Sequence, residues 1–303
     1  MNLSDSEIIS GLMRDKGYQI VDNLESAGIV LINTCSVREH AEERVLQRIR
    51  SLKKNKKDQD FVLGLIGCMA ERLKEKIFEL ENEIDIVLGP DNYRELPGCI
   101  NEIERKRRIC DIDLSDEETY SDITPLRESA ISAWIPIMRG CDNYCSYCIV
   151  PYTRGSERSR THESIIEESK KLIAQGYKEL YLLGQNVNSY KDGNKDFADL
   201  LRDVAELNSE VRLRFMTSHP KDLSDKLIYT IRDYPNICKY IHLPFQAGSD
   251  RILEMMNRKY TRKGYLDLIA KIKKNIPDVS LSTDIIVGFP TETESEFEDT
   301  LNL

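Results

Sequence analysis

Apolar residues in the first hundred positions come in short continuous runs, and the stretches between them have helical spacing. The runs at 28–33, 61–66 and 84–88 are typical of strands that are buried on both faces. Such strands alternate with helices in parallel sheets that are covered on both sides. The pattern therefore predicts an α/β domain with a parallel sheet over residues 1–115.

The chain opens on a predicted helix instead of a strand. Ser4 and Glu7 have the spacing of a capping box, apolar residues follow three and four apart, and Gly17 is a suitable helix stop. At the other end, a helix from about Thr293 runs to the last residue without a strand behind it. Because an α/β domain ordinarily opens with a strand and closes its sheet, we expect a chain that is truncated at both ends. The alternative is a domain that starts and finishes on helices.

A second domain is predicted over 129–303, after an acidic linker at 116–128. Strands are expected at 133–138, 179–183, 212–216, 240–243 and 280–287, with helices at 162–175, 196–207, 222–233, 249–257, 262–275 and from 293. Repeated strand–helix units indicate a partial (β/α) barrel, in which the loops after the strands carry the active site.

Composition narrows the class of protein. The net charge of −9 argues against a domain that binds nucleic acid through a basic coat alone, although most of the acidic excess lies within residues 1–128. No apolar run approaches the roughly 18 residues of a membrane helix, and no signal peptide is present. We therefore expect a cytoplasmic protein without membrane contact, whose eight cysteines are thiols, metal ligands or catalytic groups instead of disulfides.

Three cysteines follow the first strand of the second domain at close spacing, Cys141, Cys145 and Cys148. Three thiolates suit a 4Fe-4S cluster with one iron left open, because no fourth Cys or His lies nearby at a suitable spacing. The alternatives are a zinc site that lacks a ligand, or free thiols.

Two further cysteines follow predicted strands of the first domain. Cys35 comes after the run at 28–33, and Cys68 comes after the run at 61–66. Their side chains converge if the two strands are neighbours, because the carboxyl ends of parallel strands share one edge. The alternative is a pair of unrelated buried thiols.

The spacing Cys-x3-Cys-x2-Cys, with Tyr147 before the last cysteine, resembles the radical S-adenosylmethionine (SAM) enzymes. Longer phrases resemble the radical SAM methylthiotransferases: Asn33-Thr-Cys-Ser-Val-Arg-Glu-His40, Gly67-Cys-Met-Ala-Glu-Arg72, Arg139-Gly-Cys-Asp-Asn-Tyr-Cys-Ser-Tyr-Cys-Ile-Val-Pro-Tyr-Thr-Arg-Gly155 and His242-Leu-Pro-Phe-Gln-Ala-Gly-Ser-Asp250. The Ser-Val-Arg-Glu continuation resembles the branch that modifies tRNA.

This resemblance implies an enzyme that puts a methylthio group on carbon 2 of N6-dimethylallyladenosine at position 37 of tRNA. One SAM would supply the methyl group and another the 5′-deoxyadenosyl radical. The open iron of the cluster on Cys141, Cys145 and Cys148 would bind SAM. The implied partners are the tRNA anticodon loop, a flavodoxin- or ferredoxin-like electron donor and a sulfur donor, with the protein acting as a monomer.

Family members carry a second, auxiliary 4Fe-4S cluster on three cysteines of the first domain. Cys35 and Cys68 match two of them, and the third normally lies just before a Met-Asn like Met1-Asn2. Members also complete the barrel and add a small C-terminal β-domain that helps to bind RNA. We therefore expect that residues 1–303 alone do not build a normal auxiliary cluster, and whether the chain is active by itself is open.

The resemblance also implies a SAM site at the mouth of the barrel. Its expected residues are Tyr147, Gln185, Asn186, Ser218, Gln246, Asp284 and Gly288. Arg154, Arg158 and Arg160 are candidates for tRNA phosphates, or one of them for the SAM carboxylate. The alternative for all of these is an ordinary polar or charged loop. The basic runs at 53–57 and 105–108 are interpreted as solvated helix faces.

Other functions remain as alternatives. Related branches of the family modify threonylcarbamoyladenosine in tRNA or an aspartate of a ribosomal protein. From a different class, the chain would be a non-catalytic iron–sulfur electron carrier or an RNA-binding module, neither of which needs an open iron. Cleavage of SAM to 5′-deoxyadenosine distinguishes the enzyme from these.

Overall fold

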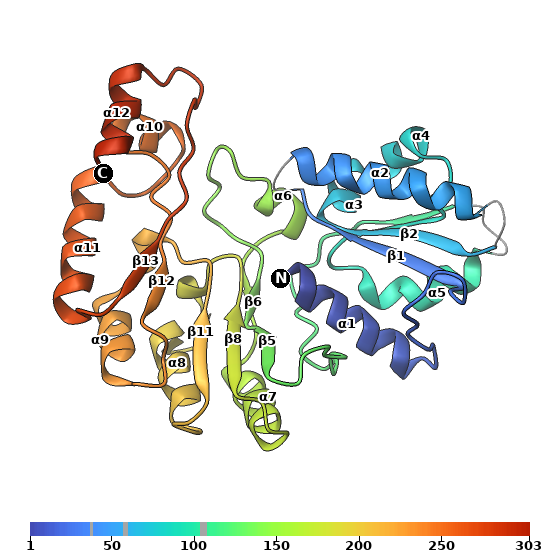
Figure 1. Ribbon diagram of the computed structural model, residues 1–303, viewed down its shortest axis with the longest axis horizontal. Helices are drawn as coiled ribbons and strands as arrows, with labels where there is room; N and C mark the ends of the chain where they lie inside the picture. Colours follow the sequence, from blue (N-terminus) through green and yellow to red (C-terminus); the bar gives the residue numbers. More distant parts are fainter. Residues whose placement is uncertain (37–38, 57–59, 104–107) are drawn as a thin grey trace. The chain divides into compact units, whose positions relative to one another are not determined.

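The computed structural model describes residues 1–36, 39–56, 60–103 and 108–303, which fold as two compact units (Figure 1). Unit 1 contains Met1–Glu128 together with Ile149–Ser156, and unit 2 contains Ser129–Cys148 together with Glu157–Leu303. The chain thus returns to unit 1 for one short segment directly after the cysteine loop. The predicted charged faces at 53–57 and 105–108 lie largely outside the described residues.

Unit 1 is built on a parallel sheet of four strands in sequence order. These are β1 (Ile29–Thr34), β2 (Val62–Gly67), β3 (Ile86–Leu88) and β4 (Ile109–Asp111), and β1 lies at one edge. The first three lie within the predicted runs or one residue beyond them. Strand β4 was not predicted, because three residues give no recognisable apolar run.

Helices pack on both faces of this sheet. They are α1 (Asn2–Asp15), α2 (Glu39–Lys56), α3 (Cys68–Leu73), α4 (Ile77–Leu80), α5 (Leu96–Glu102) and α6 (Val150–Arg154), with 3-10 turns at Lys74–Lys76 and Tyr93–Glu95. Alternate strand residues enter different cores: Ile66 and Leu88 pack with α1 and α5, whereas Leu65 and Val87 pack with α2 and α3. Burial on both faces explains why the strands have continuous apolar sequences.

The start of α1 differs from the prediction. The helix begins at Asn2 with Met1 as its N-cap, and the amide of Asp5 donates to the Met1 carbonyl at 2.7 Å. Ser4 and Glu7 do not form a capping box, because both lie inside the helix and are buried in unit 1. The predicted stop is close to the observed one: α1 ends at Asp15, and Gly17 has a φ of +89°.

The segment 116–128 packs within unit 1 and is not an exposed linker. Tyr120 is buried, its hydroxyl donates to the Pro90 carbonyl at 3.0 Å, and its ring stacks on Tyr93. The amide of Leu126 donates to the Glu7 carbonyl at 2.8 Å. Its acidic side chains hid this packing, because only the few apolar residues of the segment face inward.

Unit 2 contains a three-stranded parallel sheet in the order β11–β8–β5, formed by β5 (Ser132–Pro136), β8 (Glu179–Leu183) and β11 (Arg212–Phe215). A parallel bridge from Leu213 to Ile237 leads on to β12 (Tyr240–His242), which pairs in parallel with β13 (Ser280–Ser282). Two short antiparallel pairs join β6 (Met138–Arg139) to β7 (Arg158–Ser159), and β9 (Lys191–Asp192) to β10 (Lys195–Asp196). The predicted order of parallel strands in a partial barrel is confirmed.

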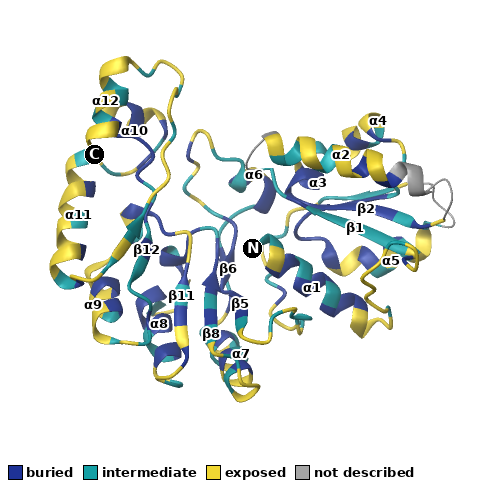
Figure 2. Cartoon of the chain, viewed as in Figure 1, coloured by how far each residue is buried: buried dark blue, intermediate teal, exposed yellow. Residues whose placement is uncertain are grey.

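The helices of unit 2 follow its strands along the chain. They are α7 (His162–Ala174), α8 (Phe197–Ala205), α9 (Asp225–Asp233), α10 (Asp250–Met255), α11 (Arg262–Asn275) and α12 (Glu294–Asn302), with 3-10 turns at Val187–Ser189 and Pro220–Asp222. The strands and the apolar faces of α7, α8, α9 and α11 form the main core, and Ala247, Ile252, Leu253 and Met256 form a smaller cluster at α10; buried residues are dark blue in Figure 2. Across the part of the chain that the structure describes, no helix is both long and apolar enough to span a membrane.

The predicted strand at 280–287 is shorter in the structure. Regular pairing ends at Ser282, after which the backbone pairs with the loop around Gln246: its amide donates to the Asp284 carbonyl, and its carbonyl accepts from the Ile286 amide. Gln246 has a φ of +68°, which turns the chain out of strand geometry. The apolar residues beyond Asp284 therefore belong to a loop.

Candidate functional site

One edge of the unit 2 sheet collects most of the residues that the sequence pointed to. Because β5, β8 and β11 are parallel, their carboxyl ends lie together. The cysteine loop follows β5 and β6, Gln185 and Asn186 follow β8, and Ser218 follows β11. The structure therefore gathers at one edge groups that are far apart in the sequence.

The segment after α10 holds the cysteine loop in place. The amide of Ser146 donates to the Met256 carbonyl at 3.1 Å, and the side-chain amide of Asn257 donates to the Tyr144 carbonyl at 2.8 Å. Tyr144 has a φ of +47°, a conformation that an aromatic residue rarely adopts. The surrounding contacts therefore impose the conformation of the loop.

Two sulfur atoms of the loop accept hydrogen bonds from side chains. Arg258 Nη1 donates to Cys145 Sγ at 3.4 Å, and Asn143 Nδ2 donates to Cys141 Sγ at 3.3 Å. The guanidinium is buried, and it also donates to the Tyr260 hydroxyl at 2.9 Å and to the Pro244 carbonyl at 3.0 Å. Donors of this kind stabilise a thiolate and orient it as a ligand.

Arg258 was missed by the sequence analysis. It lies 113 residues from Cys145 in the chain and follows a helix end with other polar residues. Nothing in its local pattern distinguishes it from a solvated turn, so only the fold shows its role.

The cysteine loop fits an iron–sulfur cluster through the chemistry of its donor set. Cys141, Cys145 and Cys148 offer three soft sulfur ligands, two of which already accept a hydrogen bond. Among the described residues, no three Cys, His, Asp or Glu side chains are grouped closely enough to hold a metal ion. Burial raises the pKa of the Cys141 thiol, so a metal that binds there must displace a proton.

Three buried polar atoms at the same edge have no hydrogen-bond partner. They are Gln185 Oε1, Asn186 Oδ1 and Ser218 Oγ. The amide nitrogen of Asn186 is engaged, since it donates to Asp222 Oδ2 at 2.8 Å. Because buried polar atoms are nearly always paired, these three point to a polar ligand, and the amino, carboxylate and hydroxyl groups of SAM fit them.

The other predicted SAM residues have more varied surroundings. The Tyr147 hydroxyl lies 3.4 Å from Arg258 Nη1, next to the cysteine loop. Gln246 is buried, whereas the side chain of Asp284 is mostly exposed and lies 3.4 Å from His242 Nε2. Gly288 has a φ of +69°, with open space around its α-carbon, and its amide donates to Glu292 Oε2 at 2.6 Å.

His219 lies near this edge as a neutral side chain. Burial, with the positive charges of Arg258 and Lys221 adding to it, lowers the pKa of His219 to about 3. Its Nδ1 accepts a hydrogen bond from the Lys221 amide at 3.2 Å. Its burial and this hydrogen bond give the side chain a structural role.

The three arginines interpreted as phosphate ligands are all buried, each about 5% exposed. Arg160 donates to Glu168 Oε2 at 2.7 Å and to the Pro136 carbonyl at 3.1 Å, and Arg154 pairs with Asp5 at 2.6 Å. Arg158 lies on β7, where its backbone is in register with that of Arg139 on β6. Buried charges need partners inside the protein, so the burial of these side chains argues against the phosphate contacts expected from the sequence.

Cys35 and Cys68 meet the condition set for their convergence, because β1 and β2 are neighbours. Thr34 is in register with Gly67, so each cysteine is the first residue after the end of its strand. The Thr34 hydroxyl donates to the Ile66 carbonyl at 2.6 Å and accepts from the Met69 amide at 3.2 Å. This seam joins the end of β1 to the start of α3.

The remaining cysteines of unit 1 lie elsewhere in the fold. Cys99 is buried in α5 and Cys110 lies on β4. Burial raises the pKa of Cys99 to about 11 and that of Cys110 to about 12. Burial therefore favours the protonated thiol at both positions near neutral pH.

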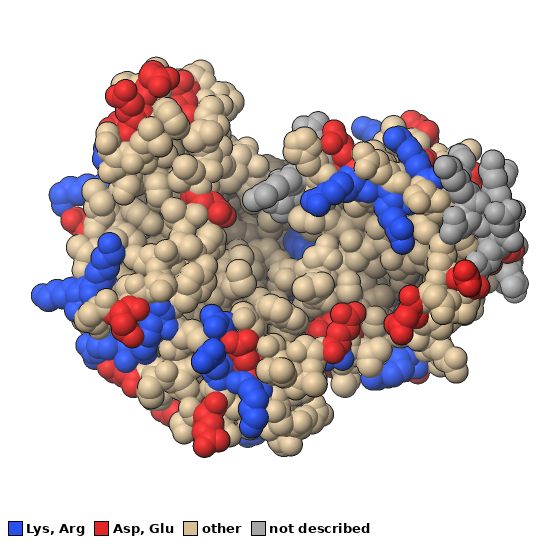
Figure 3. Space-filling view, in the orientation of Figure 1, with Lys and Arg blue, Asp and Glu red and all other residues tan. Residues whose placement is uncertain are grey.

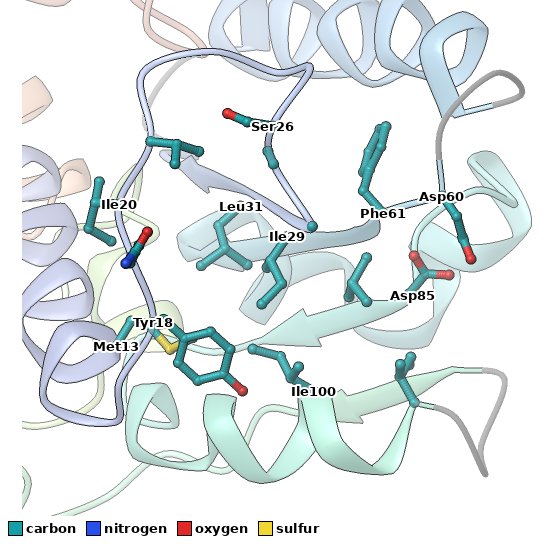
Figure 4. A pocket seen from close by; sticks show the side chains of 16 residues that line it. Met13, Tyr18, Ile20, Ser26, Ile29, Leu31, Asp60, Phe61, Asp85 and Ile100 are labelled. Atoms are coloured by element: carbon teal, nitrogen blue, oxygen red, sulfur yellow. The ribbon is translucent and has the colours of Figure 1, made fainter.

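A cavity of about 840 Å³ opens in unit 1 at the edge opposite the cysteines (Figure 4). Ile29 and Phe61 line it at the amino ends of β1 and β2, facing Tyr18 and Ile100. Its lining is largely apolar, with Asp60 and Asp85 as acidic members. The cavity is thus separate from Cys35 and Cys68 of the same unit.

Charged side chains are mixed over the face seen in Figure 3. Acidic side chains gather over α12, whose first turn carries Glu294 and Glu296. Lysines and arginines are scattered between acidic neighbours, and this view shows no continuous basic surface.

Comparisons with known proteins define the class. The Radical SAM superfamily model matches residues 135–303, and that of "Uncharacterized protein family UPF0004" matches residues 1–89. Two solved radical SAM enzymes share the fold: the cobalamin-dependent OxsB (TM-score 0.71, 13% identity, covering 100% of this chain and 49% of that one) and the methyltransferase TsrM from Kitasatospora setae (TM-score 0.70, 12% identity, 100% and 68%). The fold and the cysteine loop are those of a radical SAM enzyme, a family that implies a 4Fe-4S cluster and SAM.

Curated relatives narrow the family. Proteins from Chloroherpeton thalassium, Bacteroides fragilis and Amoebophilus asiaticus are 51%, 50% and 47% identical over all of this chain, and each is named tRNA-2-methylthio-N(6)-dimethylallyladenosine synthase. This chain belongs to their family, the radical SAM methylthiotransferases, as its sequence motifs indicated. It spans 66–68% of the length of these relatives.

Proposed function

We propose that this chain is the SAM-binding part of an enzyme that attaches a methylthio group to carbon 2 of N6-dimethylallyladenosine at position 37 of tRNA. The observation that carries the proposal is the loop of Cys141, Cys145 and Cys148 at the carboxyl edge of a barrel-like sheet. It occurs in a chain 47–51% identical to curated synthases of that name. The proposed substrate implies work in the cytoplasm.

The residues of unit 2 are proposed to have two roles, binding of the cluster and binding of SAM. The three cysteines hold the cluster, while Arg258 and Asn143 donate to two of their sulfur atoms. Gln185, Asn186 and Ser218 present unpartnered polar atoms to SAM. A reduced cluster held there would supply the electron for the reductive cleavage of SAM to methionine and a 5′-deoxyadenosyl radical.

Radical chemistry suits the proposed substrate. Carbon 2 of adenine carries a hydrogen that ordinary bases do not remove, so a hydrogen atom must be abstracted. The base lies in a single-stranded loop of tRNA, where a protein can turn it out of the stack and bind its edge. The polar edge of unit 2 is the surface that would receive it.

Unit 1 is proposed to take part in sulfur transfer. Cys35 and Cys68 directly follow the ends of two neighbouring strands, and they offer sulfur ligands for an auxiliary cluster. Arg154 Nη1, a buried donor without a partner in the same unit, suits a nearby anionic group. A flavodoxin- or ferredoxin-like protein is the proposed source of electrons.

Mass spectrometry of tRNA nucleosides tests the proposal. In a strain that lacks the gene, the methylthio form of dimethylallyladenosine should disappear and its unthiolated precursor should accumulate. The intact gene should restore the modification, and the same gene with Cys145→Ala should not. An unchanged dimethylallyladenosine pool, with a loss of methylthiolated threonylcarbamoyladenosine or of a modified ribosomal-protein aspartate, would assign the protein to another branch.

A further inference from the structure

A buried arginine lies beside one cysteine of unit 1. Arg154 ends α6, the short helix that unit 1 receives from the segment 149–156. Its Nε donates to Cys68 Sγ at 3.2 Å, and its Nη2 donates to Asp5 Oδ2 at 2.6 Å. The guanidinium therefore bridges a sulfur atom and a carboxylate within one unit.

The third nitrogen of this guanidinium is unsatisfied. Nη1 of Arg154 is buried and has no hydrogen-bond partner. A buried donor without an acceptor is costly, and buried polar groups in proteins nearly always find a partner. Nη1 belongs to the guanidinium that contacts Cys68. A further acceptor beside Nη1, best an anionic one, would therefore lower the free energy of the folded protein.

The Asp5 carboxylate compensates the positive charge of the buried Arg154 guanidinium. Asp5 lies on α1 and is fully buried, so it needs a cation as much as Arg154 needs an anion. The pair fixes the guanidinium plane and leaves Nε directed at the sulfur atom. Asp5 therefore orients Arg154, and Arg154 contacts Cys68.

We propose that Arg154 is a positioning residue for Cys68, holding its sulfur at the end of β2 and compensating negative charge that gathers there when the thiol becomes a ligand. The inference rests on the proposed role of Cys68 as a cluster ligand. The group that Nη1 would contact is anionic and rich in sulfur. This role replaces phosphate binding as the function of Arg154.

The experiment measures the local charge at Cys68 in the full chain without iron. Cys68 is alkylated at one fixed pH with iodoacetate, an anion, and with neutral iodoacetamide, and peptide mass spectrometry gives both rate constants. The same thiol attacks both reagents, which are similar in size, so their ratio largely cancels access and thiolate content. A nearby positive charge speeds the anionic reagent selectively.

Arg154→Gln should lower the iodoacetate-to-iodoacetamide ratio at Cys68 by about threefold or more, because Asp5 then acts alone. Asp5→Asn should raise the ratio, and Arg154→Lys should retain most of it. The ratio at Cys99, in α5 of the same unit, is the internal control and should stay constant. A purely structural role predicts no opposite changes from the two single variants.

The double variant Asp5→Asn/Arg154→Gln covers the case in which a single variant fails to fold. It removes both buried charges, so its ratio should lie between those of Asp5→Asn and Arg154→Gln. If only one of these single variants folds, the ratio of the double variant should lie between that of the folded single variant and that of the wild type. Equal ratios at Cys68 in the wild type, Asp5→Asn and the double variant would overturn the inference. Failure of unit 1 to bind iron would instead contradict the proposed auxiliary cluster, and it leaves this measurement unaffected.

Discussion

Buried charged groups mark the chemistry of this protein at the scale of single residues. Arg154 and Arg258 each place a guanidinium against a cysteine sulfur, one in each unit. Glu71 is a third such group, buried in unit 1 with Oε2 unpartnered. The burial and the contacts of each side chain affect the stability or the chemistry of its unit. Substitution of each one should therefore have a measurable effect.

Glu71 should make the stability of unit 1 depend on pH. Burial raises its pKa from 4.5 to about 7, although the positive charge of Lys74 opposes the shift. The folded state thus holds this proton more tightly than the unfolded state, and the stabilisation is lost as the pH rises from about 4.5 to 7. Glu71→Gln should therefore raise the free energy of unfolding by about 2 kcal/mol at pH 8 and by much less at pH 4.5.

Urea denaturation at these two pH values measures the difference. The exposed neighbour Glu75→Gln is the matched control and should change stability little at either pH. Glu71→Gln variants that are equally stable relative to the wild type at both pH values would show that Glu71 ionises normally.

Arg258 should be needed for an effective cluster loop. Arg258→Met keeps much of the apolar stem but removes the charged donor to Cys145, a contact of the kind worth about 1.5–3 kcal/mol. Iron content should fall, and SAM cleavage should drop by about tenfold or more. Arg262→Met, which breaks a partly exposed ion pair with Asp299, is the control and should leave both near wild type. Normal iron content and normal cleavage in Arg258→Met would contradict the role.

The sequence contained the cysteines but not their partners. Cys141, Cys145 and Cys148 form a recognisable spacing, and the polar residues after β8 and β11 could be placed from strand order alone. Arg258 and Asp5 could not be found, because their roles depend on contacts across 113 and 149 residues, respectively, in the folded chain. Arg154 was interpreted from its charge as a phosphate ligand, since sequence does not show that its side chain is buried against Cys68 and Asp5.

At the scale of secondary structure, the seam between β1 and β2 positions Cys35 and Cys68. Thr34 is buried, and its hydroxyl links the Ile66 carbonyl to the Met69 amide at the start of α3. Cys35 directly follows Thr34, and Cys68 directly follows Gly67, the register partner of Thr34. The hydroxyl thus fixes the strand end against the helix that begins with Cys68.

Thr34→Val keeps the shape of the side chain but removes this link. Two buried backbone groups lose a partner, so the free energy of unfolding should fall by about 1–3 kcal/mol. Thr34→Ser should retain most of the stability. Denaturant unfolding measures the loss, with the exposed Thr124→Val as control. A cost for Thr34→Val no larger than that for Thr124→Val would show that the seam is unimportant.

Elements with strong patterns were predicted well, and short ones were not. Strand β8 and helix α11 match their predicted ranges, because both have clear apolar periodicity and bounded ends. Strand β4 has three residues and helix α6 has five, too few to show a period. The start of α1 was misplaced because Ser4 and Glu7 fit a capping pattern while serving as buried helix residues.

At the scale of the whole molecule, the chain folds into two units, and each unit is built from two separate stretches of the sequence. Segment 149–156 leaves the cysteine loop of unit 2 and gives unit 1 its helix α6. The acidic charge that first argued against a nucleic-acid partner lies mostly in residues 1–128. Net charge therefore describes unit 1 better than the barrel that carries the proposed tRNA chemistry.

Cleavage of SAM tests the central claim most directly. The purified chain is reconstituted with iron and sulfide, reduced with dithionite and supplied with SAM, and 5′-deoxyadenosine is quantified by mass spectrometry. The wild type should form 5′-deoxyadenosine and methionine, and Cys145→Ala should form neither. A wild-type protein with four irons on the loop that forms no 5′-deoxyadenosine, or a Cys145→Ala variant that forms as much as the wild type, would contradict the account.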